Sequence, residues 1–159
     1  MDKNKIIREE VLLSVSGLTD EQLNEQVEEG RWSIMQVLDY LYLIEQSVVH
    51  VLSVQLASGE TKTTNEKPIH LTTNRSTKID APSFAVPSNE FITLEEIKNK
   101  LSKSRKALLN VVNSADQSLL KQRAYLHPAF GELSLHQWIP FVGLHEKRHL
   151  AQIEELKEK

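Results

Sequence analysis

Four short signals for the start of a helix divide this chain, and they constrain its fold more than any other sequence feature. In each, Ser or Thr is followed three residues later by Glu or Gln, so that both side chains can bond backbone N–H groups left unpaired by the first helical turn. The pairs are Thr19 with Gln22, Ser33 with Gln36, Thr93 with Glu96, and Ser134 with Gln137. Each precedes a stretch in which apolar residues recur with helical spacing. The pattern predicts an all-α fold.

Four long helices are predicted from these starts and from the apolar periodicity. They cover about residues 3–16, 33–58 and 93–113, and a last stretch from Ser134 to near the C-terminus. A short helical turn is expected after Thr19. We expect a single domain spanning residues 1–159, folded as a four-helix bundle.

Two connections have no helical pattern. Residues 61–92 are rich in Thr and contain several prolines, so we expect a long loop between the second and third main helices. Loops of this length are often functional in compact domains, and this one could cover a site. Residues 115–133 form the second connection, in which HPAFGE at 127–132 predicts a turn, and nothing in the pattern demands a strand.

The composition excludes several kinds of chemistry and of partner. There is no cysteine, so disulfides, thiolate metal sites and cysteine nucleophiles are absent. The formal net charge is -3, and Lys and Arg are spread along the chain without a basic face for nucleic acid. No signal peptide is visible, and no apolar run approaches the roughly 20 residues that cross a bilayer. We expect a soluble, cytoplasmic protein with neither a nucleic-acid nor a membrane partner.

Two histidines lie on the apolar stripe of the last predicted helix. His145 and His149 are four residues apart and share a face with residues such as Trp138 and Ile153, whereas Glu146 falls mainly on another face. A buried imidazole needs a polar partner. One interpretation is two core histidines bonded to groups on a neighbouring helix, and the pair alone favours it. The other is a metal site, because His at i and i+4 can direct two nitrogens to one ion.

The other histidines offer no clear third ligand, although a catalytic metal site usually has three. His50 is expected on the solvent side of its helix, and His70 lies in the long loop. His127 precedes a proline in the predicted turn, and His136 lies in the first turn of the last helix, off the stripe of His145.

Two segments of the chain form a further pattern. They are GRWSIMQVLDYLYLIEQ at 30–46 and HPAFGELSLHQWIPFVGLHEKRHLAQIEEL at 127–156. In their Trp-Ser, Leu-Ser, His-x-x-x-His and Gln-Ile elements they resemble the DinB-like superfamily, close to its branch of YfiT-type metal-dependent hydrolases. The resemblance extends over nearly the whole chain. It implies a four-helix bundle with a divalent metal, zinc or nickel, between the second and fourth helices, and two of the family's ligands correspond to His145 and His149.

The resemblance also implies where the third ligand lies, eight residues after the Trp of the Trp-Ser pair. Counted from Trp32, that position is Tyr40, so a tyrosine stands where the family has a histidine. A phenol has a pKa of about 10 and must lose its proton to bind a metal well, so affinity should fall. Alternatively, the Tyr40 hydroxyl bonds to His145 or His149 in a metal-free polar core. Asp39 is about 100° around the helix and does not automatically substitute.

Two functions follow from the resemblance. The first is a metal-dependent enzyme acting on a small molecule, either a hydrolase or a transferase that joins a low-molecular-weight thiol to an electrophile. Its metal, weakly held or absent, would lie at Tyr40, His145 and His149. The second is a non-catalytic, metal-free bundle that binds a small molecule or a protein partner. The sequence identifies no catalytic residue and leaves the formation of a homodimer open.

Overall fold

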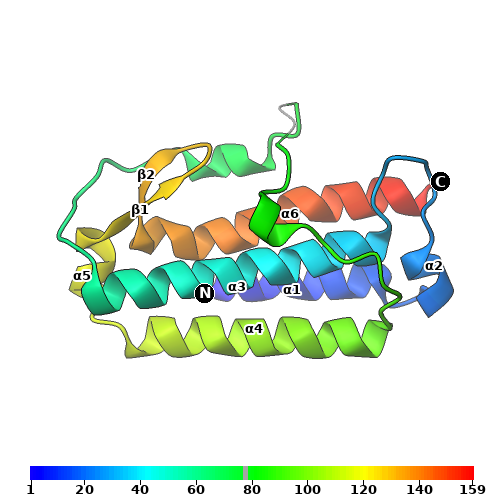
Figure 1. Ribbon diagram of the computed structural model, residues 1–159, viewed down its shortest axis with the longest axis horizontal. Coiled ribbons are helices and arrows are strands. Elements are labelled where there is room, and N and C mark those ends of the chain that lie inside the picture. Colours follow the sequence, from blue (N-terminus) through cyan, green and yellow to red (C-terminus); the bar gives the residue numbers. More distant parts are fainter. Residues whose placement is uncertain (77–78) are drawn as a thin grey trace.

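The computed structural model is a four-helix bundle, as the capping pattern predicts, and it describes residues 1–76 and 79–159 (Figure 1). Helix α6 packs against α1 and α3, and α3 also packs against α4. The long helices are α1 (Asp2–Val15), α3 (Ile34–Ser58), α4 (Leu94–Ser114) and α6 (Leu135–Lys157). The short elements are helices α2 (Asp20–Asn24) and α5 (Gln117–Gln122), 3-10 helices η1 (Ile69–Thr73) and η2 (Ser83–Ala85), and strands β1 (Ala124–His127) and β2 (Gly131–Ser134).

The predicted helix starts coincide with the observed N-caps. Two of them, Thr19 and Ser33, form full reciprocal capping boxes. The other two form half of the arrangement, in which the hydroxyl accepts a backbone N–H from the third helical residue. At α6 the Gln137 amide instead bonds both the N–H and the carbonyl of Lys67, each at 2.9 Å. This side chain therefore ties the long loop to the start of α6.

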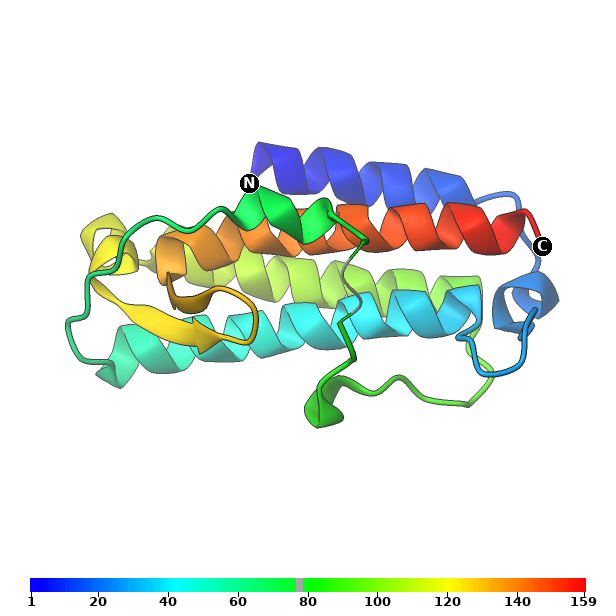
Figure 2. The ribbon, with the colours of Figure 1, turned by 90° about the horizontal axis from the view of Figure 1, so that it is seen from above.

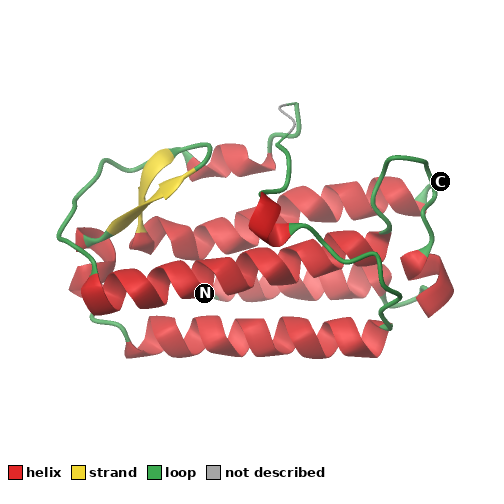
Figure 3. Ribbon diagram, in the orientation of Figure 1, coloured by secondary structure: helices red, strands yellow, loops and turns green. Residues whose placement is uncertain are grey.

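Both connections contain structure that the sequence pattern did not predict. The loop over residues 61–92 includes η1 and η2, and its residues 77–78 lie outside the described part. Residues 115–133 include α5 and a short β-hairpin, for which the sequence pattern gave no signal (Figure 3). In the hairpin His127 pairs with Gly131, whose φ of 74° favours glycine. Strands this short offer too little alternation for a pattern to show.

The long loop and the hairpin cover the face of the bundle on which α3 and α6 meet (Figure 2). The 3-10 helix η1 contacts α6, whereas η2 contacts α3. The hairpin divides its contacts in the same way, β1 against α3 and β2 against α6. Side chains at the junction of α3 and α6 are therefore enclosed on the outer side as well.

The apolar core is divided into two parts by a layer of charged side chains. One part lies among α1, the first half of α3 and the second half of α6, and includes Leu38 and Ile153. The other lies among the second half of α3, the first half of α6 and α5, and includes Leu52 and Leu135. Between the two parts lie Arg8, Glu45, Arg105 and Glu146. The sequence pattern placed Glu146 mainly on another face than His145, and that face is also buried, since Glu146 as a whole residue is 1% exposed.

Helix α3 has the length and the apolar composition of a membrane-spanning helix. Among the described residues it is the one helix that is long and apolar enough to cross a bilayer. The prediction that no apolar stretch of the chain reaches this length therefore does not hold for α3. In the bundle α3 packs against both α4 and α6 and buries apolar side chains from Ile34 to Leu52. The central helix of a bundle has the same length and composition, and this packing accounts for them.

Helices α1 and α6 approach each other closely at Gly143. An added Cβ there would overlap Asn4 Oδ1 and lie 3.3 Å from Asn4 Cα. Asn4 cannot easily move, because its amide donates a 2.9 Å hydrogen bond to the carbonyl of Ile139. We expect Gly143→Ala to lower the free energy of unfolding by about 1–2 kcal/mol, because overpacking outweighs the helix propensity of alanine. Urea denaturation followed by circular dichroism measures the change.

The matched control for this substitution is Gly17→Ala. A Cβ at Gly17 would meet no atom within 4 Å. The control should therefore change the free energy of unfolding by less than about 0.5 kcal/mol. If Gly143→Ala were as stable as the control, α1 and α6 would not depend on this close contact.

Candidate functional site

The structure places the three predicted site residues side by side. Tyr40 comes from α3, and His145 and His149 come from α6. The ring centroid of Tyr40 lies 5.2 Å from that of each imidazole, and the two imidazole centroids are 4.6 Å apart. The i, i+4 spacing puts both imidazoles on the face of α6 that meets α3. Their role as metal ligands stays a prediction.

Two further aromatic rings flank this group. Trp32, just before α3, lies 5.1 Å from Tyr40 between centroids, and Phe141, one turn before His145, lies 5.6 Å from it. Tyr40 is 6% exposed and His145 7% exposed, while His149 and Trp32 are partly buried. The group is thus an aromatic cluster largely shielded from water.

The two imidazoles differ in their hydrogen bonds. His149 Nδ1 lies 2.8 Å from Gln152 Oε1, which can only accept, so Nδ1 donates and Nε2 keeps its lone pair. Within the described part of the chain no hydrogen bond to the His145 ring is seen, although the residue is only 7% exposed. Among the described residues neither imidazole bonds to a neighbouring helix, as the interpretation of two bonded core histidines would require. A bond from the Tyr40 hydroxyl to either imidazole is not seen among the described residues either.

Burial keeps both imidazoles neutral. It lowers the pKa of His145 well below the usual 6.5, and His149, Arg148 and His127 act in the same direction. It also lowers the pKa of His149 to about 4. Burial raises the pKa of Tyr40, although the charge of Arg148 acts to lower it. The imidazoles are thus in the protonation state that binds metals, whereas the phenol must first lose its proton.

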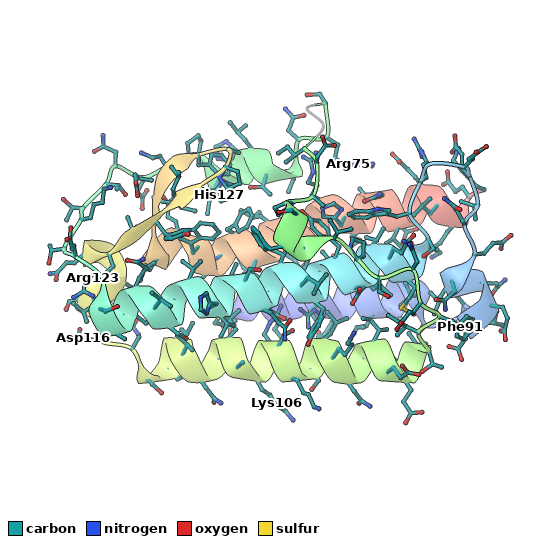
Figure 4. The ribbon with its side chains drawn as sticks, viewed as in Figure 1. Arg75, Phe91, Lys106, Asp116, Arg123 and His127 are labelled. Atoms are coloured by element: carbon teal, nitrogen blue, oxygen red, sulfur yellow. The ribbon has the colours of Figure 1, made fainter. Side chains whose placement is uncertain are left out.

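His127 is buried, which its predicted place in a turn did not indicate (Figure 4). Its ring centroid lies 4.6 Å from that of Phe141 and 4.9 Å from that of Trp138. Its Nδ1 accepts backbone N–H groups from Ala129 and Phe130, so the proton of the neutral ring is on Nε2. Neither nitrogen is thus arranged as a third ligand. Among the described residues, no group of three or more His, Cys, Asp and Glu could hold a metal ion.

The remaining candidates do not enter the site. His50, His70 and His136 are exposed, as predicted for His50. Asp39 is buried, but its Oδ2 accepts the backbone N–H of Ser88 at 3.1 Å. It therefore holds the long loop against α3 and does not replace the absent histidine.

Sequence reasoning missed how the long loop is held near the histidines. Arg148, adjacent to His149, donates to the carbonyls of Thr72 and Asn74 at 3.1 and 2.7 Å. Arg75, labelled in Figure 4, pairs with Glu155 of α6 at 2.6 Å. No local pattern could identify these contacts, because they join a loop to a helix some 75 residues later in the chain.

A cavity of about 680 Å³ opens beside Trp32. It lies between the start of α3 and the end of the long loop, and its lining includes Gln36, Asn89 and Phe91. Its volume is that of a typical small-molecule site. Because Trp32 also contacts Tyr40, the cavity borders the aromatic cluster.

Comparison with known proteins settles the family. The profile of the DinB superfamily matches residues 5–153. The chain belongs to the DinB superfamily. Within known sequences it is similar to the uncharacterized protein YuaE of Bacillus subtilis (strain 168), with 37% identity over 145 residues that make up 91% of this chain and 89% of YuaE. The resemblance drawn from the two sequence segments is confirmed.

Two solved structures share the four-helix bundle fold of this chain. TT2238, described as a four-helix bundle protein, has a TM-score of 0.66 at 21% identity and covers 97% of this chain and 94% of its own. YfiT from Bacillus subtilis has a TM-score of 0.67 at 16% identity and covers 99% of this chain and 83% of its own. YfiT is described as a probable metal-dependent hydrolase with an unusual four-helix bundle topology. At these identities the likeness shows the fold alone.

The buried histidines predict that stability falls in mild acid. In the folded chain the pKa values of His127 and His149 are about 4, against about 6.5 in an unfolded chain. Between these values the unfolded chain binds more protons, so the free energy of unfolding decreases as pH falls from 6.5 toward 4. The slope is up to about 1.4 kcal/mol per pH unit for each histidine. Urea titrations across this range measure it.

Single substitutions separate this effect from the titration of carboxylates. His127→Gln should reduce the slope, because one buried imidazole is removed. His50→Gln should leave it unchanged, because His50 is exposed. If both variants kept the slope of the natural protein, burial of His127 would not contribute to the acid sensitivity.

Proposed function

We propose that this chain is a metal-dependent enzyme in which His145 and His149 hold a divalent ion, with Tyr40 as the third protein group. The main support for this proposal comes from His145. Its side chain is neutral, the residue is 7% exposed, and no hydrogen bond to the ring is seen among the described residues. A neutral imidazole that no described group bonds has a lone pair available to an ion, and neutral imidazole suits zinc and nickel. His149 supplies a second imidazole 4.6 Å away between centroids.

The hydrogen bond of His149 also fits a ligand. Metal-binding histidines usually donate their other N–H to an oxygen, which fixes the tautomer and the ring orientation. Gln152 Oε1 accepts from His149 Nδ1 at 2.8 Å, and Nε2 is then the nitrogen available to an ion. Gln152 is one turn along the same helix, so the orientation is set locally.

Tyr40 makes the proposed ion weakly held. Burial raises the pKa of its phenol, which must ionise to bind a metal well, and Arg148 only partly opposes this. Within the described residues no third His, Cys, Asp or Glu completes the set. We expect zinc or nickel to bind less tightly here than in a site of three imidazoles.

The proposed reaction is hydrolysis, or transfer of a low-molecular-weight thiol, on a small-molecule substrate. A divalent ion would supply the nucleophile by lowering the pKa of a bound water or thiol. Trp32 and Phe141 shield the imidazoles. A Tyr40 phenol that keeps its proton would not bind the ion and would instead donate a hydrogen bond to the substrate. The cavity beside Trp32 has the volume for a small molecule. The description of YfiT as a probable metal-dependent hydrolase supports the first reaction.

A metal-free binding module is the second candidate. It is favoured by the edge-on packing of Tyr40 against both imidazoles, at interplanar angles of 65° and 85°. Such aromatic pairs are stabilising in themselves, so the cluster does not require an ion. A bundle of this kind would bind a small molecule or a protein partner without catalysing a reaction.

Restoring a histidine on α3 tests the metal site. Tyr40→His should bind zinc or nickel at least about tenfold more tightly than the natural protein, because a neutral imidazole needs no ionisation comparable to that of the phenol. The gain should diminish in acid, because imidazole must be deprotonated to bind. Isothermal titration calorimetry of untagged protein measures both affinities.

Two controls define the outcomes. Tyr125→His adds a histidine at an exposed tyrosine of the hairpin and should not change the affinity. Adding His145→Ala to Tyr40→His should abolish the gain. Equal affinity of the natural protein and Tyr40→His would mean that Tyr40 is no impediment. If neither bound metal, the enzyme proposal would be abandoned for the binding module.

A further inference from the structure

A ring of four ionic side chains crosses the bundle beside the site. Arg8 of α1 contacts Glu45 Oε1 of α3 at 2.8 Å and Glu146 Oε1 of α6 at 2.6 Å. Arg105 of α4 contacts the other oxygen of each carboxylate, at 2.7 Å for Glu45 and 2.8 Å for Glu146. Each long helix thus contributes one member, and the two positive charges balance the two negative ones. We call these four residues the ionic layer.

The ionic layer is nearly removed from water and fully bonded. The side chains of Glu45 and Glu146 are 0% and 2% exposed, and those of Arg8 and Arg105 are 9% and 12% exposed. Ser104 adds a hydrogen bond to Glu45 Oε1 at 2.5 Å. Such groups pay a large desolvation penalty, and well-packed apolar side chains in their place are often equally stabilising. Stability alone therefore does not account for the layer.

At this level of the bundle, charged side chains make up most of the fully buried groups of α3 and α6. Over residues 143–152 of α6, all of them described, the buried side chains are those of His145 and Glu146. Over residues 42–47 of α3, also all described, the buried side chain is that of Glu45. Partly buried apolar side chains of these stretches, among them Ile44 and Leu150, also pack against the core, but the fully buried contacts to α1 and α4 at this level are ion pairs.

We infer that the ionic layer positions the site by setting the rotation of α3 and α6 about their axes. Glu146 directly follows His145, so the two arginines that hold Glu146 also determine where the preceding imidazole points. A rotation of α6 by one residue, about 100°, would carry His145 away from Tyr40. Glu45 and Glu146 are positioning residues that act through the helices. The metal-affinity part of the test below rests on the proposed function, and the NMR part does not.

The main test replaces the whole layer with apolar side chains, by Arg8→Met, Glu45→Leu, Arg105→Met and Glu146→Leu together. The variant should fold with a denaturation midpoint at or above that of the natural protein. Nuclear Overhauser effects between the Tyr40 ring and the imidazoles of His145 and His149 should weaken or vanish. The dissociation constant for zinc should rise by about 10- to 100-fold, as when outer-shell partners of a metal site are removed.

A second variant keeps the charges and so keeps the fold. In Arg105→Lys an ammonium replaces the planar fork that reaches both carboxylates. The same ring contacts should weaken, and zinc affinity should fall by less than in the quadruple variant. If the quadruple variant does not fold, Arg105→Lys decides. The control, Glu28→Gln with Arg31→Gln, removes the exposed ion pairs of Glu28 with Arg31 and Lys159 and should change neither measurement.

The outcomes separate this inference from the proposed metal site. Unchanged Tyr40–imidazole contacts in every folded layer variant would overturn the inference, whatever the zinc affinity. Loss of those contacts supports it even if the natural protein binds no zinc, which would instead count against the proposed function. Loss of contacts together with loss of zinc affinity supports both.

Discussion

Arg8→Met should lower the free energy of unfolding by about 3–5 kcal/mol, the cost of removing one partner from a buried ion pair. Arg8 donates hydrogen bonds to Glu45, Glu146 and the carbonyl of Leu101. Without it, two buried carboxylates share the single charge of Arg105. Burial by itself would raise the pKa of Glu45, and its arginine partners outweigh that effect and lower it. Urea or guanidinium denaturation measures the loss.

The control for Arg8→Met is Lys5→Met on the same helix. Lys5 is exposed and should contribute less than about 0.5 kcal/mol. A loss below about 1 kcal/mol for Arg8→Met would show that water reaches the carboxylates and replaces the guanidinium. The contrast with the all-apolar quadruple variant is informative, because breaking the layer is costly whereas replacing it entirely is not.

Trp138→Ala should also cost about 3–5 kcal/mol, because the indole is nearly buried and fills the end of the core beneath the hairpin. Trp138 is 7% exposed, and its ring centroid lies 4.9 Å from that of His127 and 5.5 Å from that of Phe141. Its Nε1 donates to the carbonyl of Tyr125 at 3.4 Å. The substitution would leave a cavity between α6 and the hairpin, measurable by chemical denaturation.

Phe84→Ala provides the comparison for Trp138→Ala. Phe84 is an aromatic residue of η2 that is 70% exposed, so its removal should cost less than about 0.5 kcal/mol. A cost below about 1 kcal/mol for Trp138→Ala would mean that the hairpin does not pack on α6 in solution.

Much of the bundle could be predicted from local sequence. Ser33 and Thr93 mark helix starts because a hydroxyl at an N-cap bonds an N–H only three residues away. The face of α6 was also predictable, since Trp138 and His145 are both buried even though Pro140 lies between them. Pro140 is the sixth residue of α6 and cannot donate a backbone hydrogen bond to the carbonyl of His136, yet the helix continues to Lys157 and keeps the same buried face.

The hairpin and the packing of the long loop against α6 could not be predicted from local sequence. Strands β1 and β2 are too short for a period to show, and β-pairing depends on the partner strand. The Gln137 side chain was expected to complete a capping box, but it pairs with Lys67 because the loop offers both a donor and an acceptor. These outcomes depend on which segments meet in space.

The sequence by itself determined the helices of this protein, the shared face of His145 and His149, and the family, because each depends on spacing along the chain. Only the tertiary structure decided that Tyr40 meets both imidazoles and that Glu146 is buried against Arg8. The residues of that last pair are 138 positions apart, and no local pattern records such a distance. In a sequence, a charged residue that will be buried cannot be told from one on the surface. Once the fold buries it, the cost of desolvation requires an oppositely charged partner.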